Sequence, residues 1–175
     1  MIVFLIGFMG SGKSSIGRMV AEKLSWSFLD TDTQLENKSG KSISEFFDQA
    51  GESAFRREEK LLLSAIIPAK ENIIVATGGG MPCFSGNIEL MNEHGITIYL
   101  KLPASLLAER LQSHENKRPL LTGKTNLNAY ITEVLAEREF FYKKATYTLD
   151  IQSADNEKQL AVKIEKLIKN HKNGK

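Results

Sequence analysis

Five short apolar runs recur along the chain, and the stretches between them have a different periodicity. A run of four to eight apolar residues bounded by turn residues is typical of a buried strand. The intervening stretches place apolar residues three and four positions apart, as on one face of a helix. Strands that alternate with helices predict a five-stranded parallel sheet covered on both faces, a three-layer α/β/α fold. The runs are IVFLI at 2–6, WSFLD at 26–30, IIVAT at 73–77, ITIYLK at 96–101 and YTLDI at 147–151.

The segment between the second and third runs is longer than one crossover helix requires, at about 40 residues. The stretch SISEFFDQAGESAFRREEKLLLSAI predicts two helices interrupted at Gly51. A capping box formed by Ser42 and Glu45 opens the first of them. We therefore expect a small helical insertion over about residues 33–62.

Two later segments also depart from the strand pattern. SHENKRPLLTGKTN at 113–126 is polar and has little apolar periodicity, which predicts a mobile lid over about residues 112–126. The sequence after about residue 155 predicts an amphipathic helix, with the terminal HKNGK fraying into solvent. The apolar face of this helix comprises Leu160, Ile164, Leu167 and Ile168.

Length and charge set limits on the class of protein. A chain of 175 residues fits one domain. Its 23 basic and 21 acidic residues give a net charge of +2, so nothing global indicates nucleic acid or an anionic membrane as a partner. The single cysteine, Cys83, fits a reducing compartment, and no run of 18 apolar residues is present. We expect a cytoplasmic monomer.

The loop after the first apolar run carries the clearest chemistry. GFMGSGKS at 7–14 has the form Gly-x4-Gly-Lys-Ser between a predicted strand and a predicted helix, the context of a P-loop. The glycines let successive backbone N–H groups turn toward phosphate oxygens, and the start of the helix adds partial positive charge. We expect Lys13 to reach the β- and γ-phosphates of a nucleotide and the Ser14 hydroxyl to ligate Mg²⁺.

Two carboxylates end the second predicted strand, in FLDTD at 28–32. Residues two apart on an extended chain point to the same side, so Asp30 and Asp32 can face one cleft. One carboxylate near Ser14 suffices for Mg²⁺, which leaves the other to bind or deprotonate a hydroxyl group. The alternative is that Asp32 caps the following helix.

Three further segments predict the binding of an anionic acceptor. Arg56 and Glu59 are three apart on one helix face, where they can pair and leave the guanidinium positioned to grip a carboxylate. Three glycines in TGGG at 77–80 let backbone approach a ligand closely. Arg138 and Arg118 supply two cations, one for an acceptor carboxylate and one for the phosphoryl group in transfer.

Together these segments resemble the shikimate kinases. GFMGSGKSSIGR, FLDTD, GESAFRREE, ATGGG, RPLL and EREFFY occur in family order from the P-loop to about Tyr142. A P-loop alone identifies only a superfamily, whereas this ordered set is specific. The resemblance implies transfer of the γ-phosphoryl group of ATP to the 3-hydroxyl of shikimate, a step in aromatic amino-acid synthesis, with Mg²⁺ as the cofactor.

On the donor side, the resemblance implies that the P-loop binds ATP and that Asp30 holds Mg²⁺ together with Ser14. Lys13 and Arg118 would be catalytic, and Arg118 would reach the transferring phosphate from the lid. Arg110 is the nearest candidate for a basic residue that stacks on adenine. The implied ATP-binding residues are Gly10, Ser11, Gly12, Lys13, Ser14, Ser15, Arg110 and Arg118.

On the acceptor side, Asp32 would bind the shikimate hydroxyls and is the candidate base. Arg56 and Arg138 would clamp the shikimate carboxylate, with Glu59 holding Arg56 in place. The backbone of Gly78, Gly79 and Gly80 would complete the pocket.

Two other functions remain open on the sequence alone. A gluconate kinase or a nucleoside monophosphate kinase would share the P-loop and differ in its acceptor. A nucleotide-dependent regulator would bind ATP without transferring phosphate, although this chain has every residue that transfer requires. We expect ATP and shikimate as small-molecule partners and no nucleic acid, because basic residues are interspersed with acidic ones.

Overall fold

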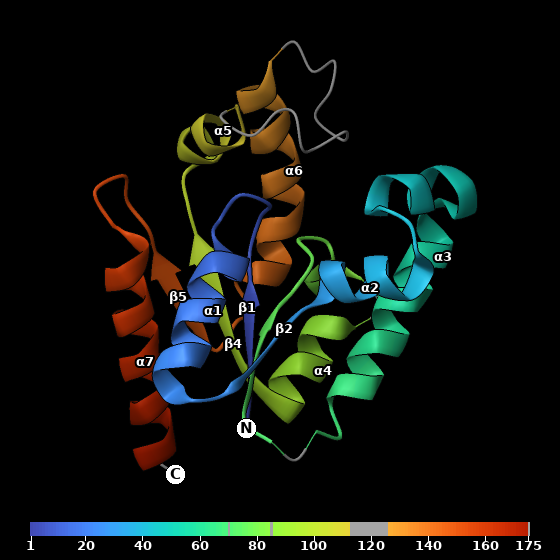
Figure 1. Cartoon of the computed structure of the whole chain (residues 1–175). Coiled ribbons are helices and arrows are strands. Elements are labelled where there is room, and N and C mark those ends of the chain that lie inside the picture. Colours follow the sequence, from blue (N-terminus) through green and yellow to red (C-terminus); the bar gives the residue numbers. More distant parts are fainter. Residues whose placement is uncertain (70, 85, 113–125, 175) are drawn as a thin grey trace.

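The computed structural model describes residues 1–69, 71–84, 86–112 and 126–174. Five parallel strands form one sheet in the order β2-β3-β1-β4-β5, and helices cover both of its faces (Figure 1). The predicted α/β/α fold is thus confirmed. The strands are β1 (Ile2–Ile6), β2 (Ser27–Asp30), β3 (Ile73–Ala76), β4 (Gly95–Lys101) and β5 (Tyr147–Asp150).

Helices connect successive strands of this sheet. Residues 113–125, which hold most of the predicted lid, lie outside the described residues. None of the helices in the described ranges has the length and apolar character that crossing a membrane requires. The helices are α1 (Lys13–Leu24), α2 (Thr31–Ser39), α3 (Ile43–Ile66), the short 3-10 helix η1 (Met81–Cys83), α4 (Asn87–His94), α5 (Ala104–Gln112), α6 (Leu127–Tyr142) and α7 (Glu157–Asn173).

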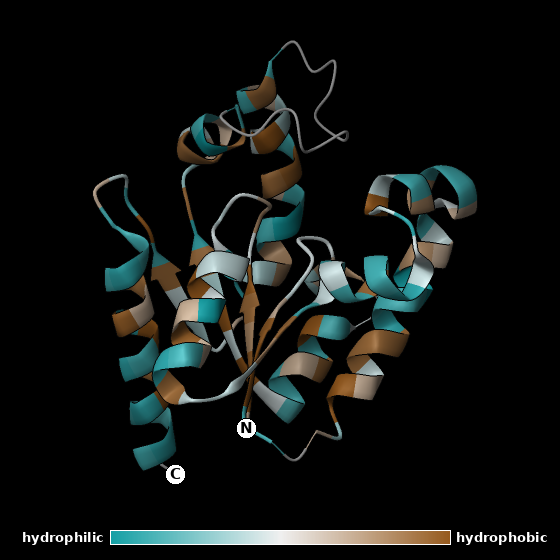
Figure 2. Ribbon diagram, viewed as in Figure 1, coloured by the Kyte–Doolittle hydropathy of each residue, from teal (hydrophilic) through white to brown (hydrophobic). Residues whose placement is uncertain are grey.

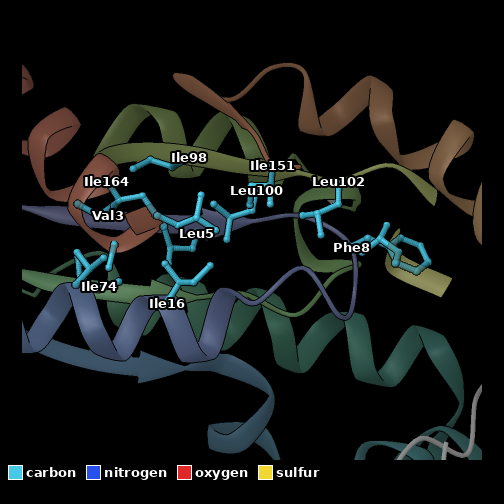
Figure 3. Packing of buried hydrophobic residues seen from close by; sticks show 14 of the residues in the cluster. Val3, Leu5, Phe8, Ile16, Ile74, Ile98, Leu100, Leu102, Ile151 and Ile164 are labelled. Atoms are coloured by element: carbon cyan, nitrogen blue, oxygen red, sulfur yellow. The ribbon is translucent and has the colours of Figure 1, made fainter. Parts of the chain in front are cut away.

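Alternate side chains of each central strand are buried on opposite faces of the sheet. Val3 and Leu5 of β1 pack with residues of α1 and α7, including Ile164, in the cluster that Figure 3 shows. Phe4, between them in sequence, packs on the other face against α3 at Leu63. In Figure 2 the strands are mostly hydrophobic, whereas the helices around them mix hydrophobic and hydrophilic residues. Burial on both faces explains why the strands read as continuous apolar runs.

The predicted insertion consists of α2 and α3, which stand to one side of the sheet (Figure 1). The capping box is present, because the Ser42 hydroxyl accepts from the Glu45 N–H and the Glu45 carboxylate accepts from the Ser42 N–H. The predicted interruption also occurs: Gly51 has φ 77° and ψ 168°, a conformation open mainly to glycine. Beyond this kink, α3 runs toward the sheet and carries Arg56 and Glu59.

The C-terminal helix is longer than the sequence suggests. α7 buries Leu160, Ile164 and Ile168 as predicted, but it continues to Asn173. The expectation that HKNGK frays is therefore wrong for residues 171–173, which are helical, although Lys172 and Asn173 are exposed to solvent. The Nδ1 atom of His171 lies 3.0 Å from the Tyr147 hydroxyl, so the last turn is fixed to β5.

Candidate active site

Three predicted motifs meet at one edge of the sheet. β2, β3 and β1 are neighbours and parallel, so the loops after their carboxyl ends lie side by side, where ligands of such sheets bind. The P-loop follows β1, Asp30 to Asp32 follow β2, and the glycines at 78–80 follow β3. A cleft of about 420 Å³ lies there and is lined by residues from all three loops.

The P-loop holds its lysine at the centre of the turn. Gly10 and Gly12 have φ angles of 81° and 91°, which other residues rarely adopt. The Lys13 ammonium donates to the carbonyl oxygens of Gly7 and Phe8, each at 2.9 Å, and its side chain is buried. The loop therefore presents a cation and the start of α1 to the same part of the cleft.

Both carboxylate oxygens of Asp30 accept hydrogen bonds. Its Oδ2 accepts from the Ser14 hydroxyl at 2.5 Å, and its Oδ1 accepts from the N–H groups of Asp32 and Thr33 at 3.1 and 3.2 Å. Asp30 is thus the N-cap of α2, and the alternative that Asp32 caps this helix is wrong. The helix starts two residues earlier than that alternative requires.

The pairing of Ser14 with Asp30 is compatible with Mg²⁺ binding. Mg²⁺ prefers oxygen ligands and is commonly held by one or two carboxylates together with water and substrate phosphates. The Ser14 hydroxyl and the Asp30 carboxylate supply such oxygens beside the P-loop. Within the described ranges, no cluster of three or more His, Cys, Asp or Glu side chains could hold a metal by itself. A magnesium ion at this site would therefore depend on phosphate and water for its remaining ligands.

The glycine loop after β3 packs directly on the acidic residues. A Cβ atom on Gly78 would lie 2.5 Å from Asp32 Oδ1 and 3.2 Å from Glu59 Oε1, so a side chain here would force Asp32 to move. The Gly78 N–H donates to the Thr31 hydroxyl at 2.8 Å. These contacts place Asp32 between the glycine loop and the cleft, which Asp32 also lines.

Arg56 reaches the same loop from α3. A Cβ atom on Gly80 would lie 2.7 Å from Arg56 Nη1. Nη1 pairs with Glu59 at 2.7 Å, as the spacing predicts, and Nη2 pairs with Glu52 at 2.9 Å. The Phe84 ring lies over the guanidinium, with its centroid 4.0 Å from Cζ. These contacts fix the direction of the guanidinium.

Burial raises the pKa of two groups near Arg56. Burial raises the pKa of Glu59 above its ordinary value, although Arg56 beside it acts in the opposite direction. Burial also raises the pKa of the Cys83 thiol to about 11, against the charges of Arg138 and Arg56. Cys83 is therefore a protonated, packed side chain at neutral pH.

Arg138 approaches the glycine loop from α6. A Cβ atom on Gly79 would lie 3.5 Å from Arg138 Nη1, and the guanidinium lies over the Phe8 ring at 5.6 Å. One turn further along α6, the Tyr142 hydroxyl donates to the Gly79 carbonyl at 2.5 Å and ties this helix to the loop. Arg56 and Arg138 thus flank the same three glycines.

The fold brings most of the predicted site residues together. Ser11 is buried within the P-loop, with its Oγ 3.4 Å from Lys13 Nζ. Gly78, Gly80, Arg56 and Arg138 adjoin the cleft through the glycine loop. Arg118 lies outside the described residues. The predicted residues that line the cleft from the P-loop are Gly10, Gly12, Lys13, Ser14 and Ser15, and those from other segments are Asp30, Asp32, Gly79 and Arg110.

The sequence did not predict the part that Glu157 takes in this cleft. Glu157 is the first residue of α7, and its carboxylate accepts a hydrogen bond from the Ser15 hydroxyl. A signal was present, because Glu157 opens the helix after β5 and so belongs to the edge of the sheet where the other motifs lie.

Comparisons with known proteins agree with this geometry. Residues 9–169 match the family model for shikimate kinase. A shikimate kinase from Azobacteroides pseudotrichonymphae is 45% identical over 152 residues, 86% of this chain and 89% of that protein. The crystal structure of a shikimate kinase from Bacteroides thetaiotaomicron has a TM-score of 0.91 at 33% identity and covers 97% of this chain and 98% of that one. A shikimate kinase from Acinetobacter baumannii in complex with shikimate has a TM-score of 0.88 at 34% identity and covers 98% and 94%. The chain belongs to the shikimate kinase family.

Proposed function

We propose that the protein transfers the γ-phosphoryl group of ATP to the 3-hydroxyl of shikimate and releases shikimate 3-phosphate and ADP. The observation that carries the proposal is a single cleft lined by P-loop residues together with Asp32 and Gly79. A phosphoryl donor on the loop would face an acceptor held on the glycines. The related protein from Acinetobacter baumannii, with shikimate bound, supports the choice of acceptor.

The donor would be held by the P-loop. Backbone N–H groups and Lys13 would bind the phosphates, with the Lys13 ammonium exchanging the carbonyl oxygens it now contacts for phosphate oxygens. Ser14 and Asp30 would hold Mg²⁺, which supplies positive charge to the phosphates when it is bound. Arg110, which lines the same cleft, is our candidate for the contact with adenine.

The acceptor would be held on the other side of the cleft. Arg56 and Arg138, which flank the glycine loop, would bind the shikimate carboxylate with charge-assisted hydrogen bonds. Asp32, packed on Gly78, would orient the 3-hydroxyl and accept its proton. The helical insertion over about residues 33–62 is then the acceptor-binding part of the domain, because it supplies Arg56.

The reaction would exchange one P–O bond for another. The shikimate 3-oxygen would form a bond to the γ-phosphorus while the bond from that phosphorus to the bridging oxygen of ADP breaks, and the hydroxyl proton would pass to Asp32. Both substrates are anionic, so Lys13 and, from the lid, Arg118 would offset their repulsion as well as the charge of the transferring group. Positioning of the two oxygens in line would supply much of the remaining acceleration.

Release of ADP from ATP and Mg²⁺ tests this function. We expect release when shikimate is added and little when gluconate or AMP replaces it. Arg56→Gln should raise the KM for shikimate by about tenfold or more, because a charge-assisted contact is lost. The exposed neighbour Arg57 gives a matched control, since Arg57→Gln makes the same change on the same helix outside the site. If gluconate or AMP stimulated ADP release, the acceptor would be that compound and not shikimate. If the protein bound ATP but transferred phosphate to none of the three compounds, a regulatory function would be favoured.

A further inference from the structure

A carboxylate lies within the P-loop end of the cleft. Glu157 Oε1 accepts a hydrogen bond from the Ser15 hydroxyl, and a Cβ atom on Gly12 would lie 3.6 Å from the same oxygen. Glu157 also lines the cleft beside Lys13. An acidic side chain here is unexpected, because the loop and the start of α1 otherwise favour anionic ligands.

The Ser15 hydroxyl cannot donate a hydrogen bond to Glu157 and another to a phosphate at the same time. A serine hydroxyl has one proton to donate. In the structure its acceptors are Glu157 and, at 3.1 Å, the Gly12 carbonyl. A nucleotide phosphate on the loop would require this proton and would also be repelled by the carboxylate charge.

Glu157 lies on the side of the cleft away from the acceptor residues. Asp32 and Gly79 follow β2 and β3, which are on one side of β1 in the sheet, whereas Glu157 follows β5 on the other side. Arg110, which lines the cleft as well, follows β4 on this second side. A substitution of Glu157 should therefore change the binding of the nucleotide and leave the binding of the acceptor unchanged.

We propose that Glu157 is a positioning residue that lowers the affinity of the cleft for ATP and ADP, because its carboxylate charge repels nucleotide phosphate and its oxygen competes with that phosphate for the Ser15 hydroxyl. The inference rests on the proposed function in one respect, namely that the cleft binds nucleotide. Nucleotide entry displaces Glu157 from Ser15, and return of the carboxylate favours the departure of ADP.

Titration calorimetry with ADP, without any acceptor, tests the inference on the full chain. Glu157→Gln keeps the size of the side chain and removes its charge. The Kd for ADP should fall about fivefold, the size of one modest polar contact. The gain should shrink between about 50 mM and about 500 mM salt, because salt screens the repulsion that the variant lacks. The KM for ATP should fall in parallel, with the KM for shikimate within about twofold of the wild type.

Glu165→Gln is the matched control. Glu165 lies two turns further along α7 and pairs with Lys169 at 2.7 Å, so its replacement changes the net charge equally at a distance from the loop. An unchanged Kd for ADP in Glu157→Gln would mean that the contact between Glu157 and Ser15 has no effect on nucleotide binding, and would overturn the proposal. A raised Kd would also overturn it and make Glu157 a nucleotide ligand. Loss of ADP binding from wild type and variant alike would instead overturn the proposed function, and this inference with it.

Discussion

Replacing Glu59 with glutamine should separate two effects of this buried carboxylate, one on folding stability and one on acceptor binding. Glu59 is 1% exposed and holds Arg56 Nη1 at 2.7 Å. Glutamine keeps the shape and one acceptor oxygen but removes the charge. We expect Glu59→Gln to weaken shikimate binding without a loss of folding stability.

The expected size of the binding effect follows from the contacts of Arg56. Its other carboxylate partner, Glu52, is 57% exposed, and exposed ion pairs contribute only about 0–1 kcal/mol. A hydrogen bond to a charged group contributes about 1.5–3 kcal/mol. Losing the charge on Glu59 while keeping the acceptor should remove about half of that contribution, about 0.8–1.5 kcal/mol, which corresponds to a rise of about fourfold to tenfold in the KM for shikimate.

Folding stability should change in the opposite direction. Burial raises the pKa of Glu59, so the folded protein favours the neutral carboxyl more than the unfolded chain does. As the pH rises past the ordinary carboxyl pKa of about 4.3, the unfolded chain loses this proton first, and the stability of the wild type falls relative to the variant. The difference levels off above the folded-state pKa and is smallest at more acidic pH. At neutral pH, Glu59→Gln should therefore be at least as stable as the wild type, because the variant buries no charge here and Glu52 still pairs with Arg56.

Two measurements check this prediction: urea unfolding across the pH range and steady-state kinetics with shikimate. Glu58→Gln is the control, because Glu58 is the adjacent residue of α3 but pairs with Lys38 at 2.7 Å. An unaltered KM for shikimate in Glu59→Gln would refute the role of this charge in holding Arg56. A lower unfolding free energy than that of the wild type at neutral pH would show that the pairing with Arg56 outweighs the cost of burying the charge, and would contradict the stability prediction.

Three further predictions concern the P-loop, the second arginine and the core. Lys13→Ala should lower kcat by about 10³-fold, as removal of phosphate-clamping cations does elsewhere, and a loss under tenfold in the ADP-release assay would count against it. Arg138→Gln should raise the KM for shikimate by the equivalent of about 2–4 kcal/mol, whereas a raised KM for ATP alone would place Arg138 on the other substrate. Ile164→Ala removes a fully buried side chain of α7 and should cost about 2–5 kcal/mol in urea unfolding, so a cost below about 1 kcal/mol would show that α7 packs loosely.

The sequence predicted those parts of the molecule whose signals are local. The strands were evident because parallel strands buried on both faces form continuous apolar runs. The capping box at Ser42 and Glu45 and the interruption at Gly51 depend on residues within one turn of each other. The P-loop, Asp32 and the glycine loop each follow a predicted strand. The carboxyl ends of parallel strands lie at one edge of the sheet, so the sequence also indicated that these segments would lie close together.

Features that depend on distant contacts were missed or misplaced. Glu157 and Ser15 are 142 residues apart, and no periodicity links them. The final turns of α7 are held by His171 on Tyr147 and by Lys172 over Trp26, so a polar sequence that would fray in isolation stays helical. Capping by Asp30 was missed because Asp30 and Asp32 both have cap-forming side chains, and only the fold decides where α2 begins.

The position of the transferred phosphate tests the central assignment most directly. Phosphorus NMR of the product formed from ATP, Mg²⁺ and shikimate reports which oxygen carries the phosphoryl group. We expect one phosphomonoester, coupled to the proton on carbon 3 of shikimate and formed in equal amount with ADP. A phosphate on another hydroxyl, or inorganic phosphate with shikimate unchanged, would contradict it.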